Sequence, residues 1–208
     1  MVRPAPLLAT IVVATSMFGC APSVVPPAPP PSVERPDVPT PSTPHDFTRL
    51  RTEYGDRNDF FEVCEQDRPL KRLSELAGQD LWEEVVAVSE LWLRQCPVDI
   101  DAHLISATAL RELGRLAESQ HRVRWFRGLV DSILASGDGR TPQTAFVVIS
   151  VPEEYSLLRA LRLRPTSQSL APGFIDALSV VSEKGSASTI YFNPAAHFRR
   201  LRERGSSK

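Results

Sequence analysis

The chain has 208 residues, and its 24 Lys and Arg nearly balance its 25 Asp and Glu, which gives a formal net charge of −1 and a sequence pI near 6.4. Nucleic-acid binding requires a basic surface, so this balance argues against a DNA- or RNA-binding protein. About 160 residues follow the first 45, enough for one domain with a substantial core or for two small ones packed together.

The first 20 residues have the features of a bacterial lipoprotein signal peptide. The apolar run from Leu7 to Phe18 follows the basic Arg3 and is too short to span a bilayer, which takes about 20 residues. Gly19 precedes Cys20 at the end of this run, and the segment resembles a lipobox. We therefore expect residues 1–20 to act as a signal peptide with lipidation at Cys20, with ordinary secretion as the alternative.

A lipid on Cys20 would place the protein in the bacterial cell envelope. Two or three acyl chains anchor a protein stably, whereas one chain holds it only marginally. Position 21 is Ala rather than Asp, and the resemblance to lipoproteins then implies sorting to the outer membrane, facing the periplasm. The lipid bilayer, reached through acylated Cys20, is the first expected partner.

Residues 21–45 form a proline-rich segment. Ten of the chain's 19 prolines lie between residues 21 and 44, and large apolar side chains are almost absent there. Such a segment cannot bury enough surface to fold and favours extended polyproline II. We expect a disordered tether between the anchor and a folded body.

The folded part is predicted to begin with two short helices. Asp46 can cap a helix that carries Phe47, Leu50 and Tyr54 on one face, and the polar run at 56–59 would end it. Pro69 is a favourable first residue for the second helix, which Gly78 would end.

Residues 66–134 contain a period of 34 residues, which is typical of tetratricopeptide-like helix pairs. The repeat aligns Asp80, Trp82, Val85 and Trp92 with Gly114, Leu116, Ser119 and Phe126. We therefore predict a helical, tetratricopeptide-like region over residues 46–134, with helices at 101–113 and 116–134. Fewer than three repeats rarely stand alone, so another element should cover an exposed end.

The pattern changes after Asp138. Valine, isoleucine and aromatic residues predict strands at 144–151, 174–181 and 188–192, and a helix at 153–163. Pro194 would begin a last helix. The predicted fold class is therefore α+β: tetratricopeptide-like helix pairs followed by a small antiparallel sheet with flanking helices, over residues 135–208, packed on the helices.

The C-terminal half resembles an uncharacterised bacterial family, the domain of unknown function 4919. The resemblance is carried by residues 136–141 (SGDGRT), 144–149 (TAFVVI), Glu154-Tyr155, Gln168, Leu170, Asp176 and 190–193 (IYFN). It covers about residues 130–195, whereas the front half lacks a Tyr-rich segment of many members. The resemblance implies a size, an envelope location and a shape, but no activity.

Cys64 and Cys96 are the cysteines that remain after Cys20. In an oxidising envelope they could form a disulfide, but each could also be a small buried apolar residue. Both are predicted to lie on helices, and a disulfide needs Cα atoms within about 7 Å. We favour two free buried thiols and keep the disulfide as the alternative.

Four residues are candidates for a ligand-binding site: Asp138, Glu154, Tyr155 and Asp176. Their carboxylates, with Glu153, could converge for acid–base chemistry or on a hard cation. The competing explanations are structural, because glycines around Asp138 form a turn and acids in the first turn of a helix favour its dipole. We favour the structural explanations.

Other chemistries have weaker patterns. The four histidines show no zinc spacing, and neither a serine elbow nor an activated cysteine is present. We expect no catalytic residue, metal or cofactor. The arginines at 199, 200, 202 and 204 are predicted to be solvated, with anionic lipid or cell wall as an alternative contact.

The sequence favours a non-catalytic protein-interaction module with an envelope protein as partner. Trp82, Trp92 and Trp125 are large enough to be binding anchors, although we expect at least two in the core. The alternative is a carboxylate-dependent envelope enzyme, or a small-ligand or cation binder, around Asp138, Glu154 and Asp176. A second alternative is an inhibitor that protects the envelope from a wall-degrading enzyme.

Overall fold

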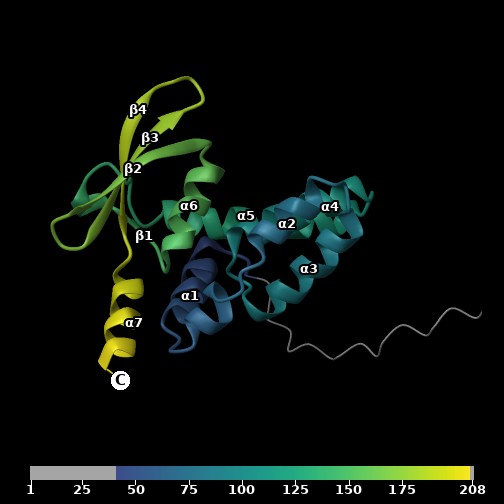
Figure 1. Ribbon diagram of the computed structural model, residues 1–208, viewed down its shortest axis with the longest axis horizontal. Helices are drawn as coiled ribbons and strands as arrows, with labels where there is room; N and C mark the ends of the chain where they lie inside the picture. The colour runs from purple at the N-terminus through teal and green to yellow at the C-terminus, as the bar shows by residue number, and fades with distance from the viewer. Residues whose placement is uncertain (1–40, 207–208) are drawn as a thin grey trace, which may run out of the picture. The chain divides into compact units, whose positions relative to one another are not determined.

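The computed structural model describes residues 41–206 (Figure 1). The predicted signal peptide, Cys20 and the tether up to residue 40 lie outside these residues. Helix α1 (Pro44–Gly55) begins inside the predicted tether, so the prediction that the tether extends to residue 45 is wrong. Proline suits the first turn of a helix because its missing N–H would have no helical partner there.

The start of α1 also corrects the predicted cap. Thr43, rather than Asp46, is the N-cap residue, and its hydroxyl accepts from the Asp46 N–H at 3.2 Å. Asp46 in turn accepts from the Thr43 N–H at 3.1 Å. The two residues form a capping box, so Asp46 stabilises the helix from its first turn.

A π-helical turn, η1 (Phe61–Glu65), follows α1 and contains Cys64. We predicted that Cys64 lies on a helix, but it lies on a π-helical turn, which is rare and has no reliable sequence signal. The next helix, α2 (Leu70–Ala77), confirms the prediction of a helix between Pro69 and Gly78.

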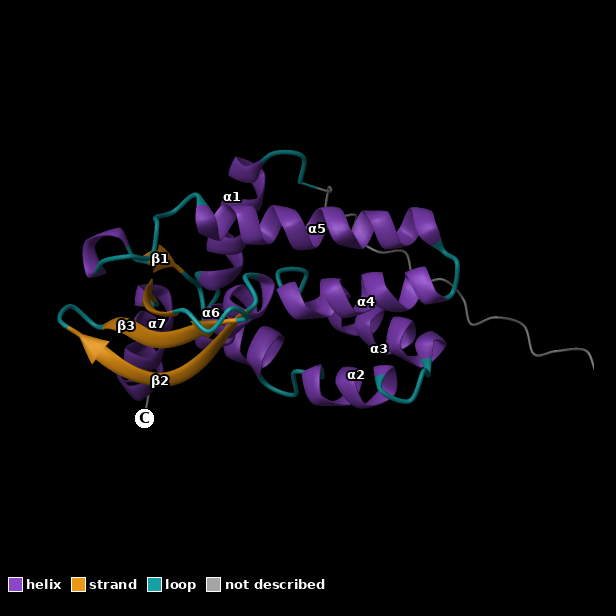
Figure 2. Cartoon of the chain, turned by 90° about the horizontal axis from the view of Figure 1, so that it is seen from above, coloured by secondary structure: helices purple, strands orange, loops and turns teal. Residues whose placement is uncertain are grey.

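Helices α3 (Trp82–Gln95), α4 (Ile100–Glu112) and α5 (Leu116–Leu134) continue the helical part. Short turns join successive helices, which lie side by side and run in alternating directions (Figure 2). Gly114 makes the turn before α5 with a φ of +73°, a conformation that glycine adopts without strain. The predicted helices are confirmed to within about one residue, whereas the likeness to tetratricopeptide repeats stays a prediction.

The packing of α1 on α5 depends on Gly128. A Cβ atom at this position would lie 2.1 Å from the Phe47 ring, so only glycine lets the two helices approach this closely. Phe47 also contacts Trp125 edge-to-face, with ring centroids 5.6 Å apart. Trp92 and Trp125 are buried, as we expected for at least two tryptophans.

The C-terminal part begins with the 3-10 turn η2 (Pro142–Thr144), the short strand β1 (Phe146–Val147) and helix α6 (Val151–Ala160). Strands β2 (Leu163–Ala171), β3 (Ile175–Ser182) and β4 (Ala187–Asn193) follow, and α7 (Ala195–Ser206) ends the described chain. The four-stranded sheet has the order β1-β4-β3-β2. Helices and sheet together confirm the α+β class.

The sheet corrects two details of the prediction. The predicted strand at 144–151 is wrong except at Phe146 and Val147, since Ser150 caps α6 and Pro152 lies in its first turn. β1 pairs with β4 in parallel, so the sheet is mixed rather than antiparallel. The sequence also missed β2, whose exposed polar residues and Pro165 lack a strand pattern.

The buried face of the sheet packs into the same core as the helices. Leu178 and Phe192 are fully buried there together with Leu157 and Leu158 of α6. α6 contacts β2 as well as α4 and α5. This places α6 at the junction of the helical part and the sheet.

Candidate functional site

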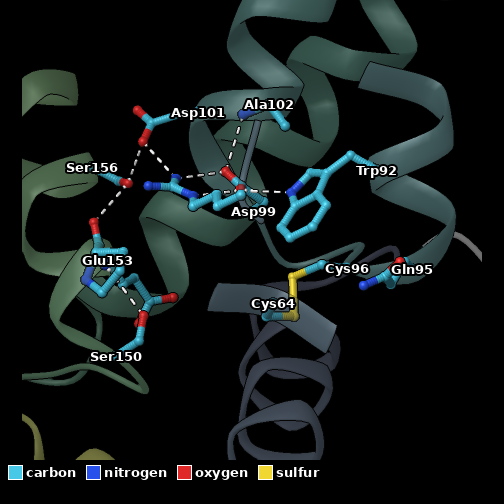
Figure 3. Close-up of polar contacts among 12 residues, drawn as sticks. Cys64, Trp92, Gln95, Cys96, Asp99, Asp101, Ala102, Ser150, Glu153 and Ser156 are labelled. Atoms are coloured by element: carbon cyan, nitrogen blue, oxygen red, sulfur yellow. Dashed lines mark hydrogen bonds and ion pairs between the residues drawn. A yellow bond between two sulfur atoms is a disulfide. The ribbon is translucent and has the colours of Figure 1, made fainter. Parts of the chain in front are cut away.

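A cluster of buried charges lies at this junction (Figure 3). The Arg68 guanidinium donates to both oxygens of Asp99, at 2.7 and 2.8 Å, and to Asp101 at 2.8 Å. Asp99 also accepts from the Ala102 N–H at the start of α4 and from the Trp92 indole. Both carboxylates are therefore held by several donors, which suits a structural role.

Asp101 connects this cluster to α6. Its carboxylate accepts from the Ser156 hydroxyl at 2.6 Å and from the Arg159 guanidinium. Burial alone would raise the pKa of Asp101, but the hydrogen bonds from Arg159 and Ser156 and the two arginine charges outweigh it, so the pKa lies below its ordinary value. Asp101 thus stays ionised and ties α4 to α6.

A second buried ion pair joins α1 to α6. Arg51 donates to both oxygens of Glu153 at 2.8 Å, and both side chains are 4% exposed. Arg51 also donates to the Ser132 hydroxyl and to the Val147 carbonyl, while Glu153 accepts from the Ile149 N–H. Glu153 therefore serves the architecture rather than reaching a ligand.

The structure brings together only two of the four predicted site residues, Glu154 of α6 and Asp176 of β3. Glu154 is fully buried, Asp176 is 5% exposed, and neither Glu154 oxygen makes a direct hydrogen bond within the described residues. Burial is the largest cause that raises the pKa of Glu154, and together with the negative charges of Asp176 and Glu153 it brings the pKa to about 9. Glu154 is therefore protonated at neutral pH beside Asp176.

Asp138 and Tyr155 lie apart from this pair. The exposed Asp138 accepts from the Arg140 N–H and the Thr144 hydroxyl within its own loop. Gly139 has a φ of +66°, and a Cβ atom there would lie 2.4 Å from the Phe146 ring, so this loop is the turn that the structural explanation predicted. The Tyr155 hydroxyl donates to Gln168 on β2.

Cys64 and Cys96 form a disulfide, with Cα atoms 5.2 Å apart. The prediction of two free thiols is therefore wrong, and the alternative holds. The predicted helices gave no information about the distance between the two cysteines, because Cys64 lies on the π-helical turn η1 and Cys96 is the C-cap residue that follows α3. Gln95 lies beside the disulfide (Figure 3) and reinforces the same connection by donating to the Val63 carbonyl at 2.9 Å.

A groove of about 550 Å³ lies beside this connection. Residues from η1, α2, α3 and the loop between η1 and α2 line it, and we call it the α2–α3 groove: Glu62, Gln66, Asp67, Pro69, Arg72, Val88, Leu91, Trp92 and Gln95. Leu91 is 62% exposed. No pattern in the sequence indicated the groove, although Leu91 is an apolar residue exposed on α3.

A much smaller cavity, about 20 Å³, lies inside the junction among Arg68, Asp99, Glu153 and their neighbours. This volume suits one buried water molecule rather than a substrate. Glu154 and Asp176 line neither hollow. Both side chains of the acidic pair are buried.

Metal-binding and basic clusters give no further site. Across residues 41–206 no group of three or more His, Cys, Asp or Glu is placed to hold a metal ion. His103 is buried, stacks on Trp125, and burial lowers its pKa to about 3.

Arg200, which we expected to be solvated, is 7% exposed and donates to the carbonyls of Gly55 and Ile149. No helix among the described residues is long and apolar enough to cross a membrane.

Comparison with known protein families identifies the family of this chain. The family model of the Domain of unknown function (DUF4919) matches residues 58–201, which include η1, α6 and the whole sheet. The chain belongs to the DUF4919 family. Neither the curated proteins nor the solved structures gave a match. DUF4919 membership carries no activity, so function has to be argued from the geometry.

Proposed function

We propose that this DUF4919 protein is a lipid-anchored bacterial envelope protein that binds another envelope protein in the α2–α3 groove, without catalysis of its own. Acylated Cys20 would hold it to the outer membrane, facing the periplasm. The groove is the observation that carries the binding role. Protection of the envelope from a wall-degrading enzyme is a more specific form of the same proposal.

The groove suits the apolar side of a partner's helix. Val88 and Leu91 are three residues apart on α3 and lie on one face of the helix, opposite Pro69. Arg72, Asp67 and the polar groups of η1 form a rim that can fix orientation. Leu91 makes little contribution to the core, because most of its surface faces solvent.

The carboxylate-dependent alternative has less support. Its three acids are divided between an exposed turn, which holds Asp138, and a buried pair, Glu154 and Asp176, which lines neither of the two hollows described above. Acid–base catalysis needs groups within hydrogen-bond reach of a substrate. A protein-binding role requires only an accessible surface, which the α2–α3 groove provides.

Photo-crosslinking in intact cells tests the binding role. A crosslinking amino acid at Leu91 should give one specific adduct, and the same amino acid at Lys71, which is 91% exposed and does not line the groove, should not. The partner from the adduct should bind the purified wild-type protein. Leu91→Asp should weaken this binding at least about tenfold, because it would bury an unpaired carboxylate against the apolar side of the partner.

The matched control is Lys71→Asp, which should leave the dissociation constant unchanged. Equal adducts at both positions, or tight binding by a folded Leu91→Asp variant, would count against the groove. Mass spectrometry of the N-terminal peptide tests the anchor separately. A free Cys20 thiol in protein isolated from the envelope would disprove the lipidation.

A further inference from the structure

The two hairpin turns of the sheet differ in chemistry. Glu183, Lys184 and Gly185 form the β3–β4 turn, as is usual for an exposed turn. The β2–β3 turn and its flanks, residues 170–175, read LAPGFI and contain no polar side chain. Leu170 is 57% exposed and Phe174 is 64% exposed. We call residues 170–175 the apolar tip.

The backbone of Phe174 makes its exposure more informative. Its φ is +61°, in the left-handed region that bulky side chains rarely adopt. Glycine would make the same turn without strain. The turn itself therefore does not require phenylalanine, and the ring is displayed to solvent at a conformational cost.

Helix α7 extends the apolar tip. The Phe174 ring lies against Phe198, with ring centroids 5.7 Å apart. Leu201 follows Phe198 by three residues, so it lies on the same side of α7, and it is 51% exposed. The two phenylalanine rings thus join the β2–β3 turn to α7, and Leu170 and Leu201 add exposed aliphatic surface to the two elements.

From these observations we propose that the apolar tip docks against the surface of a lipid bilayer. Exposed aromatic and leucine side chains of this kind enter the boundary between headgroups and acyl chains. The proposal rests on the lipid anchor at Cys20 described above. The polar β3–β4 turn has no comparable surface.

The length of chain before the described body supports this occupant. Residues 21–40 lie between Cys20 and the first described residue, and 20 residues span at most about 70 Å. A lipid on Cys20 would keep the start of the described body, at residue 41, within this distance of the bilayer, and the apolar tip is part of that body. At such a high effective concentration, a contact that is weak by itself suffices for docking.

Lipid quenching of tryptophan fluorescence tests the contact. The mature, lipidated protein is reconstituted in vesicles of phosphatidylethanolamine and phosphatidylglycerol, with and without lipids brominated near the headgroup. Phe174→Trp should add fluorescence that the brominated lipids quench by about twofold or more. Bromine quenches tryptophan only at short range, so quenching requires the indole to lie at the boundary between headgroups and acyl chains. The control is Leu116→Trp, which places tryptophan at a 59% exposed site on α5 and should not be quenched.

Leu201→Trp provides a second reporter on α7, so the test does not depend on the strained position 174. Equal quenching at residues 116, 174 and 201, or none at 174 and 201, would overturn the docking. The docking would also be overturned if the tryptophan of Phe174→Trp were shielded from aqueous iodide before vesicles are added. A protein partner or a second copy of the chain would then cover the apolar tip. Mass spectrometry of the same sample separates the two proposals: unquenched reporters with acylated Cys20 disprove the docking alone, whereas a free Cys20 thiol disproves the anchor.

Discussion

Glu153 and Glu154 are neighbours on α6, yet they meet opposite environments. Glu153 lies against the Arg51 guanidinium, which donates to both of its oxygens. Glu154 lies against the carboxyl group of Asp176, with no cation among its hydrogen-bond partners in the described chain. One residue along a helix is a rotation of about 100°, and this rotation decides whether a buried acid meets a guanidinium or another carboxyl group.

The difference follows from where the arginines lie. The junction receives Arg51 from α1 and Arg68 from the loop before α2, and each pairs with an acid from another element. A buried ion pair is weak evidence for stability, but removing one partner leaves an uncompensated charge. Glu154 has no arginine partner and lies beside Asp176, so it is buried in its protonated form.

The largest expected effect is the loss of Arg51. Arg51→Ala would leave Glu153 buried without its cation, so we expect the free energy of unfolding at pH 7 to fall by about 3–5 kcal/mol. Urea denaturation measures this change. The double variant Arg51→Met with Glu153→Met should recover most of the loss.

The exposed pair of Arg115 and Glu118 provides a control, since these side chains are 41% and 53% exposed. Arg115→Ala should change stability by less than about 1 kcal/mol, because solvent screens the pair. Equal effects at the two sites would show that burial of Arg51 and Glu153 does not set their contribution.

An intermediate effect is expected at Asp101. Asp101→Asn removes the charge that Arg68, Arg159 and Ser156 contact, and we expect a loss of about 1–3 kcal/mol at pH 6. The folded pKa of Asp101 lies below its ordinary 3.8, so its contribution is present above about pH 4 and is lost as the pH falls through the folded pKa. Denaturation curves of both proteins should therefore converge towards pH 2, and a constant difference down to that pH would contradict this assignment.

The smallest effect has the opposite sign. Glu154 has a folded pKa of about 9 against an ordinary 4.5, so its favourable contribution is complete below about pH 4.5 and is lost as the pH rises towards 9. Glu154→Gln stays neutral and can donate to Asp176, so we expect it to raise stability at pH 7 by on the order of 1–2 kcal/mol. The measurement is the free energy of unfolding between pH 5 and 9.

The variant should also flatten the loss of stability over this range. A Glu154→Gln protein that is less stable than wild type at pH 8 would mean that the carboxyl group makes a favourable contact that the structure does not explain. The same variant leaves the α2–α3 groove intact, so the proposed partner should still bind it.

The four predicted site residues illustrate how far a sequence pattern reaches. Glycines beside Asp138 predicted its turn, because positive φ is a local property. The approach of Glu154 to Asp176 joins a helix to a strand and had no local signal. The groove was missed for the same reason, since the exposure of Leu91 depends on how the other elements pack around α3.

The disulfide and β2 were missed for different reasons. Cys64 meets Cys96 through the unpredicted turn η1, and the separation of 32 residues in sequence contains no information about distance in space. β2 is a strand because β3 pairs with it from Leu163 to Ala171. Its own polar residues do not require that conformation.

The sequence by itself determined the features that depend on neighbouring residues: the periodic helices, the turns at glycines, the β3 and β4 strands, the α+β class and the family. The tertiary structure alone decided which acids are paired, which cysteines meet and where the groove lies. The reason is physical. Helix and turn preferences act over a few residues, whereas burial and charge pairing depend on groups up to 100 positions apart, such as Arg51 and Glu153, that meet only when the core forms.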